Sequence, residues 1–202
     1  MRKITLLVIV LFFDLSSAFG QTNIEKIDYY CSADSSFQPA FVYNPQSDEK
    51  RPLLVALHPW SSDYTSYHGP IYSSYCIEKD WAFIFPNFRG KNKSPETTGS
   101  ELVIRDILDA VKYCKSNFNI DTTRIYLVGA SGGGHAALLM AGTNPNIWAG
   151  VSAWVPISDL NQWYKESVAM GSNYWQDISA ACEGNPTTDS SAYVEATKRS
   201  PI

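Results

Sequence analysis

Four continuous apolar runs divide the chain at intervals, at residues 52–57, 81–85, 125–128 and 148–155. A continuous apolar run is typical of a strand that is buried on both faces, as in a parallel sheet. An earlier strand is predicted at 39–43, followed by a turn region. The pattern therefore predicts a sheet whose inner strands are covered on both sides.

Segments with helical spacing lie between these runs. Residues 101–118 carry apolar side chains three and four positions apart, and Ser100 precedes them as an N-cap. Further helices are expected from residue 131 or 132, from about residue 160, and over 177–182 and 190–199. Strands that alternate with helices predict an α/β fold with a mostly parallel, doubly wound sheet.

The strongest chemical signal follows the third apolar run, where residues 129–133 read Gly-Ala-Ser-Gly-Gly. This G-x-S-x-G sequence, between a strand and a helix, is the context of a nucleophile elbow, in which a strained turn exposes the serine oxygen. The alternative is a glycine-rich turn that binds phosphate or only packs. A Walker loop would need a following lysine, which this segment lacks. Ser131 is the predicted nucleophile.

Ligands in such sheets bind at the carboxyl ends of the strands. Ser131 and the loops that follow the two neighbouring strands are therefore expected to meet at one edge. In the loop after the first apolar run, Pro59 has no N–H, so the Trp60 amide is the predicted first oxyanion donor. The Gly132 amide is the predicted second donor. The alternative for the loop that carries Trp60 is an ordinary connection between a strand and a helix.

Composition restricts the class of protein. With 202 residues, 45% of them hydrophobic and 18% charged, the chain is expected to form one globular domain. A net charge of −4 and the lack of a Lys/Arg cluster disfavour nucleic-acid binding. The spacing of Cys and His predicts no metal site, and no cofactor motif is present.

The N-terminus is organised like a secretory signal. Two basic residues precede the apolar run 4–13, and small residues precede Gln21. We expect residues 1–20 to be a signal peptide, residues 21–202 the domain, and the protein to be secreted or periplasmic. The apolar run is too short for a membrane span, and the alternatives are a buried strand or an uncleaved anchor. In an oxidising compartment the four cysteines can pair in three ways, with a buried free thiol at Cys114 as the alternative.

Three stretches, 87–90, 120–135 and 152–159, resemble the catalytic domain of prolyl oligopeptidase-like α/β-hydrolases, and the looser resemblance covers 52–202. It implies Ser131 as nucleophile, with the Gly132 and Trp60 amides as oxyanion donors. The family orders its triad as Ser, Asp and His, on loops after two further strands. We therefore expect an α/β-hydrolase fold that lacks its last strands, and a catalytic histidine that is not in this chain.

The remaining titratable candidates have structural interpretations. His58 is expected to shape the oxyanion loop, His68 to face solvent in a Tyr/Ser-rich loop, and His135 to lie along the helix, away from the Ser131 oxygen. Asp159 is expected to cap the helix that begins near residue 160, with a role as triad acid as the alternative.

These features predict a secreted serine hydrolase that forms an acyl-enzyme on carboxylic esters, including acetyl or feruloyl esters of plant polysaccharide. The alternatives are a serine-type peptidase of the same family, which would act on peptides, and a non-catalytic binding module. The segment before the core is too short for the propeller of the peptidases, which favours an esterase for small-molecule or carbohydrate esters. Aromatic side chains are expected either to line a cleft or to pack in core and lid; they are Trp60, Tyr64, Tyr67, Trp154, Trp163, Tyr164 and Trp175.

Overall fold

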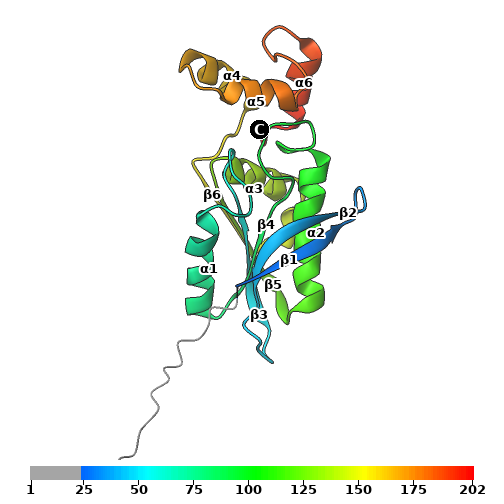
Figure 1. Cartoon of the computed structure of the whole chain (residues 1–202), viewed down its shortest axis with the longest axis vertical. Coiled ribbons are helices and arrows are strands. Elements are labelled where there is room, and N and C mark those ends of the chain that lie inside the picture. Colours follow the sequence, from blue (N-terminus) through cyan, green and yellow to red (C-terminus); the bar gives the residue numbers. More distant parts are fainter. Residues whose placement is uncertain (1–23) are drawn as a thin grey trace, which may run out of the picture.

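The computed structural model describes residues 24–202, so the predicted signal peptide lies outside the described residues. A central sheet runs between helices (Figure 1). Its strands are β1 (Ile24–Cys31), β2 (Ser36–Tyr43), β3 (Arg51–Leu57), β4 (Ala82–Pro86), β5 (Ile120–Ala130) and β6 (Gly150–Trp154). The helices are α1 (His68–Lys79), α2 (Glu101–Asn117), α3 (Gly132–Thr143), the short 3₁₀ helix η1 (Pro145–Ile147), α4 (Leu160–Ala169), α5 (Tyr174–Ala181) and α6 (Ser190–Lys198).

The six strands follow the order β1-β2-β4-β3-β5-β6. β1 and β2 form an antiparallel hairpin, and β2 is antiparallel to β4. The pairs β3–β4, β3–β5 and β5–β6 are parallel. The predicted mostly parallel sheet is therefore confirmed, with β6 as the last strand among residues 24–202.

Helices cover both faces of the sheet, as predicted for a doubly wound fold. α2 and α3 pack on one face, over a core that includes Leu53, Val55 and Leu127. α1 packs on the other face, where Cys76 joins Phe83 and other strand residues. In Figure 1, α2 lies to the right of the strands and α1 to their left.

The four apolar runs correspond to β3, β4, β5 and β6, although the last run, 148–155, extends beyond β6 at both ends. Ser100 caps α2 by accepting a hydrogen bond from the Val103 amide at 3.3 Å. Besides the short helix η1, two elements were not predicted. In β1 the neighbouring charged residues Glu25 and Lys26 are both exposed, so the strand lacks a continuous apolar run. α1 begins at His68 in a segment rich in Ser, Tyr and Gly, which are weak helix formers. The expectation of a loop at His68 was therefore wrong.

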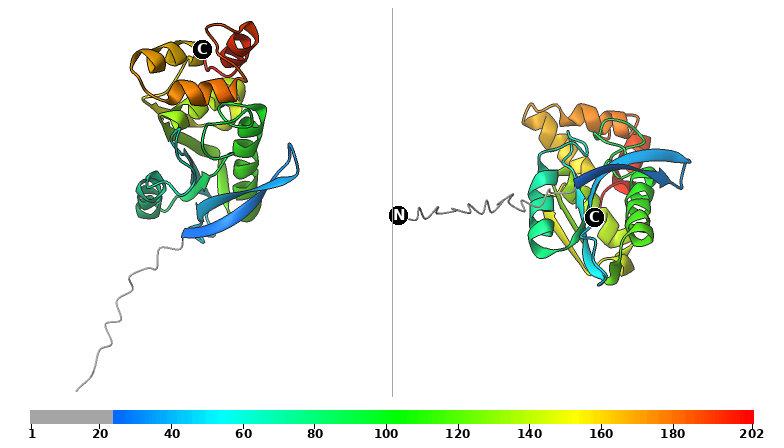
Figure 2. Two further views of the ribbon diagram at one scale, coloured as in Figure 1. Left: turned by 45° about the horizontal axis from the view of Figure 1, so that its top comes forward. Right: turned by 60° about the horizontal axis from the view of Figure 1, so that its bottom comes forward.

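Helices α4, α5 and α6, with their connections, form a cap at one end of the sheet, and we call residues 160–198 the cap (Figures 1 and 2). The cap has a hydrophobic core of its own, made of Leu160, Tyr164, Ile178, Cys182, Ala192 and Ala196, joined by Ile157 and Trp60. Trp60 is the one member of this core that comes from the β3–α1 loop.

All four cysteines are buried and unpaired in the structure, so the pairing expected in an oxidising compartment is not observed. Burial raises the pKa of the Cys31 and Cys76 thiols to about 12. The free-thiol alternative for Cys114 is confirmed.

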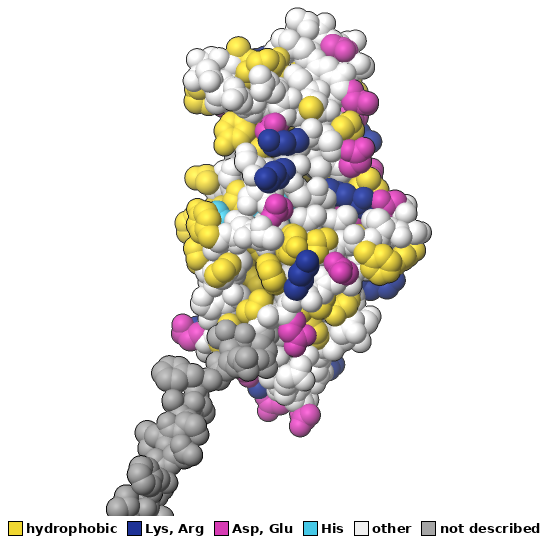
Figure 3. All heavy atoms as spheres, in the orientation of Figure 1, with side chains coloured by type: hydrophobic (Ala, Val, Ile, Leu, Met, Phe, Trp, Pro, Cys, Tyr) yellow, Lys and Arg dark blue, Asp and Glu magenta, His cyan; other side chains and the backbone are white. Residues whose placement is uncertain are grey.

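On the face of residues 24–202 seen in Figure 3, acidic and basic side chains lie among one another and form no continuous basic patch. Within the same residues, no helix has the length and apolar character needed to cross a membrane.

Candidate active site

Ser131 lies at the junction between β5, which ends at Ala130, and α3, which begins at Gly132. Its backbone has φ 56° and ψ −119°, a combination that side-chain-bearing residues rarely adopt. The strained turn is held from both sides, because the Ser131 amide donates to Trp154 O at 2.9 Å and Ser131 O accepts from the His135 amide at 2.9 Å. This is the geometry expected of a nucleophile elbow.

The glycines around Ser131 allow two backbones to cross at close range. A Cβ atom at Gly129 would fall on the backbone of Gly133, and one at Gly133 would fall on the Leu57 carbonyl. Neither glycine has a positive φ, so close approach rather than backbone conformation requires them. The elbow is thus packed directly against the end of β3.

The two predicted oxyanion donors are neighbours. A Cβ atom at Gly132 would lie 2.5 Å from the Trp60 nitrogen, so the two backbones touch. Within residues 24–202, neither of these two amides donates a hydrogen bond. Two free amides beside a serine are the arrangement that stabilises a developing oxyanion.

Ser131 borders two hollows. One, of about 450 Å³, lies toward the cap and is lined by Asp159, Gln162 and Glu166. The other, of about 300 Å³, lies between the β3–α1 loop and α5, where Tyr67 and Tyr174 line it. The sequence therefore predicted correctly that the loops after β3 and β6 meet at Ser131.

Asp159 is the N-cap of α4, as expected, and its carboxylate accepts from the Gln162 amide at 3.0 Å. The same side chain lines the hollow toward the cap. This N-cap hydrogen bond holds the Asp159 carboxylate at the start of α4, which is the structural role expected for it.

His58 is fully buried in the β3–α1 loop and stacks on Phe88 with ring centroids 4.0 Å apart. Its Nε2 lies 2.7 Å from Asn87 O and its Nδ1 lies 3.0 Å from Pro59 O. Burial lowers the pKa of the ring. A neutral ring has one N–H, which we assign to Nε2 because that contact is shorter. His58 thus anchors the loop that carries Trp60.

His135 is buried on α3, and its Nε2–H donates to Arg199 O at 2.8 Å. Burial lowers its pKa to about 4. His68 lines the hollow next to Ser131 rather than facing solvent freely, and its Nδ1 lies 2.8 Å from the Ser66 hydroxyl. Each histidine therefore has a partner other than Ser131.

The aromatic residues divide between the two expected roles. Tyr67 and Trp163 line the hollows at Ser131. Trp60 also borders one of them, but the residue is only 1% exposed and packs in the cap core. Tyr174, which the sequence did not single out, lines a hollow and lies against Trp163 with centroids 4.8 Å apart. Tyr174 reaches the site only because the cap folds back over it, and a local sequence pattern cannot predict that.

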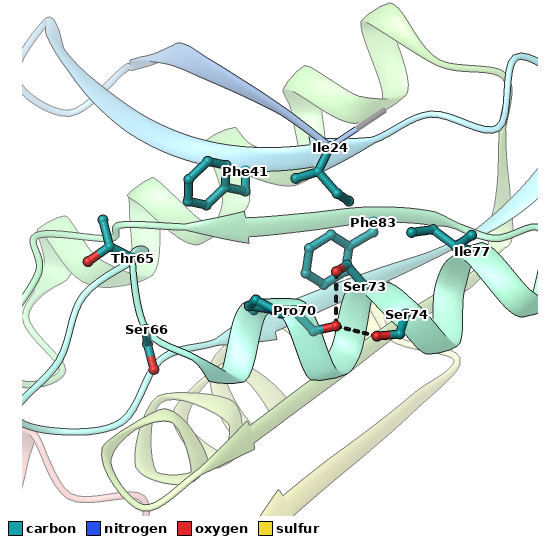
Figure 4. Close-up of a pocket in the computed structure, with 10 residues that line it drawn as sticks. Ile24, Phe41, Thr65, Ser66, Pro70, Ser73, Ser74, Ile77 and Phe83 are labelled. Carbon is teal, nitrogen blue, oxygen red and sulfur yellow. Dashed lines mark hydrogen bonds between the residues drawn. The ribbon is translucent and has the colours of Figure 1, made fainter. Parts of the chain in front are cut away.

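A third hollow lies away from Ser131, between the β1–β2 hairpin and α1, with a volume of about 460 Å³ (Figure 4). Ile24 and Phe41 point from the hairpin toward α1, which faces them with Pro70 and Ile77. The Ser73 and Ser74 hydroxyls donate to Pro70 O. The hollow is thus lined mainly by apolar groups, because the hydroxyls of these two serines are paired with a backbone carbonyl.

Residues 73–201, more than half of the chain, match the model of the prolyl oligopeptidase family. The chain belongs to the prolyl oligopeptidase family. Solved α/β-hydrolases share its fold. Prolyl oligopeptidase B from Galerina marginata aligns at a TM-score of 0.68 with 17% identity, over 88% of this chain and 26% of that one. The acylaminoacyl peptidase of Pyrococcus horikoshii aligns at 0.65 with 20% identity, over 89% and 29%.

Curated relatives of this family member include esterases. Feruloyl esterase B from Talaromyces stipitatus is 26% identical over 157 residues, which are 73% of this chain and 43% of the relative. Acetylxylan esterase from Coprinopsis cinerea is 27% identical over 125 residues, 56% of this chain and 33% of the relative. The chain thus spans less than half the length of these relatives. Family and relatives together support a serine hydrolase.

Proposed function

We propose that this chain carries the nucleophile and oxyanion hole of a secreted serine esterase. Ser131 attacks the carbonyl of a carboxylic ester, the alcohol leaves, and water releases the acid from the acyl-enzyme. The amides of Trp60 and Gly132 stabilise the oxyanion of each tetrahedral intermediate. The substrates are acetyl or feruloyl esters of plant polysaccharide.

The observation that carries the proposal is the strained Ser131 backbone next to two unpaired amides. A φ of 56° at a serine costs free energy, and such strain collects at sites where it has a use. The ester substrates are supported by the feruloyl and acetylxylan esterases among the relatives, and by Tyr67 and Tyr174 beside Ser131. Aromatic rings bind flat aryl groups and sugar faces.

The proton acceptor of Ser131 is a histidine other than His58, His68 and His135. Two of these rings are buried against backbone carbonyls, and the third bonds to Ser66. A serine without its base is a weak nucleophile, so this histidine is required for turnover.

The test is labelling of the intact protein with a fluorophosphonate, which reacts with activated serines. We expect labelling that Ser131→Ala abolishes, together with a loss of kcat on 4-nitrophenyl acetate of about 10⁶. Ser158→Ala is the matched control, since Ser158 lines the same hollow but lies outside the elbow, and it should label normally. Equal labelling of Ser131→Ala would refute the nucleophile assignment.

A peptidase is the second candidate, because the chain belongs to a family named for a peptidase. Matched acetyl and feruloyl esters and blocked peptides separate the two candidates by kcat/KM. Higher kcat/KM on peptides would replace the esterase proposal. A protein that binds these esters but neither turns them over nor labels would be a binding module.

A further inference from the structure

Trp60 belongs to two parts of the molecule at once. Its backbone lies in the β3–α1 loop beside Ser131, whereas its indole is 1% exposed within the cap core. There it meets Trp163 edge-on, with ring centroids 4.8 Å apart and planes at 75°. A single residue thus links the backbone of the proposed oxyanion hole to the helices above it.

Every polar group of Trp60 except its backbone N–H has a hydrogen-bond partner among residues 24–202. The indole Nε1 donates to the Asp177 carboxylate on α5 at 3.1 Å. The Trp60 carbonyl accepts from the Asn92 amide at 3.0 Å. Only the N–H that lies beside Gly132 is unpaired. The side-chain and carbonyl bonds together fix the residue on two sides of that free N–H.

The geometry points to Asp177 as a positioning residue: from α5, its hydrogen bond to the Trp60 indole holds the Trp60 amide in place for the oxyanion. This inference rests on the proposed function of Ser131. The indole and the amide share one Cα, so a ring that is fixed in the cap restrains that Cα and with it the direction of the N–H. Oxyanion donors act only when they are already aimed at the developing charge. Docking of α5 thus helps to fix one of the two donors of the oxyanion hole.

Asp177 makes no contact with the reacting atoms in this assignment, so its effect should fall on kcat. In the intact protein we expect Asp177→Ala to lower kcat on 4-nitrophenyl acetate about tenfold, a part of the 10²–10³-fold effect of losing one donor. KM should change less than twofold. Asp177→Asn keeps an acceptor oxygen and should retain at least half of kcat. Gln176→Ala, an exposed position on the same helix, is the matched control and should match wild type.

Trp60→Phe removes the indole N–H and keeps the backbone amide, so it should show the same tenfold loss. If one hydrogen bond is responsible, the double variant Trp60→Phe with Asp177→Ala stays near tenfold. A hundredfold additive loss, an unchanged kcat in Asp177→Ala, or no rescue by Asp177→Asn would each overturn the inference. Should Asp177→Ala unfold, Trp60→Phe and Asp177→Asn still test it. If Ser131→Ala stays active, it is the proposed function that fails instead.

Discussion

Ser131 lies between two regions that are built in different ways. On the sheet side, β3, β5 and α3 meet backbone to backbone, and a single added methyl at Gly129 or Gly133 would collide with main-chain atoms. On the cap side, α4 and α5 reach the site through side chains such as Trp163 and Tyr174. The sheet therefore sets the positions of Ser131 and the Gly132 amide, whereas the cap acts through side chains, which line the hollows and, at Asp177, bind the Trp60 indole.

One added methyl group should strongly destabilise the sheet side. Gly133→Ala places a Cβ on the Leu57 carbonyl and 2.8 Å from His58 O, and neither backbone can move away. We expect a loss of more than about 4 kcal/mol in the free energy of unfolding, the range of severe core substitutions. Urea denaturation of the purified protein measures it.

Gly142→Ala is the matched control on the same helix. A Cβ there meets nothing within 4 Å, and alanine favours a helix by about 1 kcal/mol over glycine. It should leave stability equal or higher. A stable Gly133→Ala protein would show that the crossing is less tight than the structure has it.

The contact between α3 and the end of α6, which connects the sheet side to the cap, should make the stability of the protein sensitive to acid. His135 on α3 holds Arg199 O at the end of α6, and burial lowers its pKa to about 4 from an ordinary 6.5. The unfolded chain takes up a proton below pH 6.5, but the folded protein does so only near pH 4. Stability is therefore full above pH 6.5 and falls by about 3 kcal/mol as pH drops to 4.

Unfolding free energies at pH 7, 5.5 and 4.5 measure this slope, and His135→Gln provides the comparison because its amide can still donate to Arg199 O. The variant should lose less stability between pH 7 and 4.5 than the wild type. The buried ring of His58, whose pKa is also lowered, contributes equally to both proteins. If the unfolding free energies of the two proteins fell in parallel with pH, His135 would not be the source of the acid sensitivity.

The inner strands, the elbow and the three helices of the cap were predictable from the sequence, whereas the way the cap docks on the β3–α1 loop was not. Continuous apolar runs gave β3 to β6, and the spacing of glycines around Ser131 gave the elbow, because both are local patterns. The bond between Trp60 and Asp177 joins residues 117 positions apart. The residues around Trp60 and Asp177 do not predict this hydrogen bond, because it forms only when the cap folds back over the β3–α1 loop.

His68 gives the smallest expected effect, and it tests the boundary between a pocket wall and a catalytic group. The ring lines a hollow at Ser131, but its Nδ1 lies 2.8 Å from the Ser66 hydroxyl. We expect His68→Ala to lower kcat/KM on 4-nitrophenyl acetate less than tenfold, because only a wall of the hollow is lost. His68→Asn, which can keep a bond to Ser66, should lie closer to wild type. General bases contribute far more in such enzymes, so a loss of 10³-fold or more in both variants would make His68 the base of Ser131.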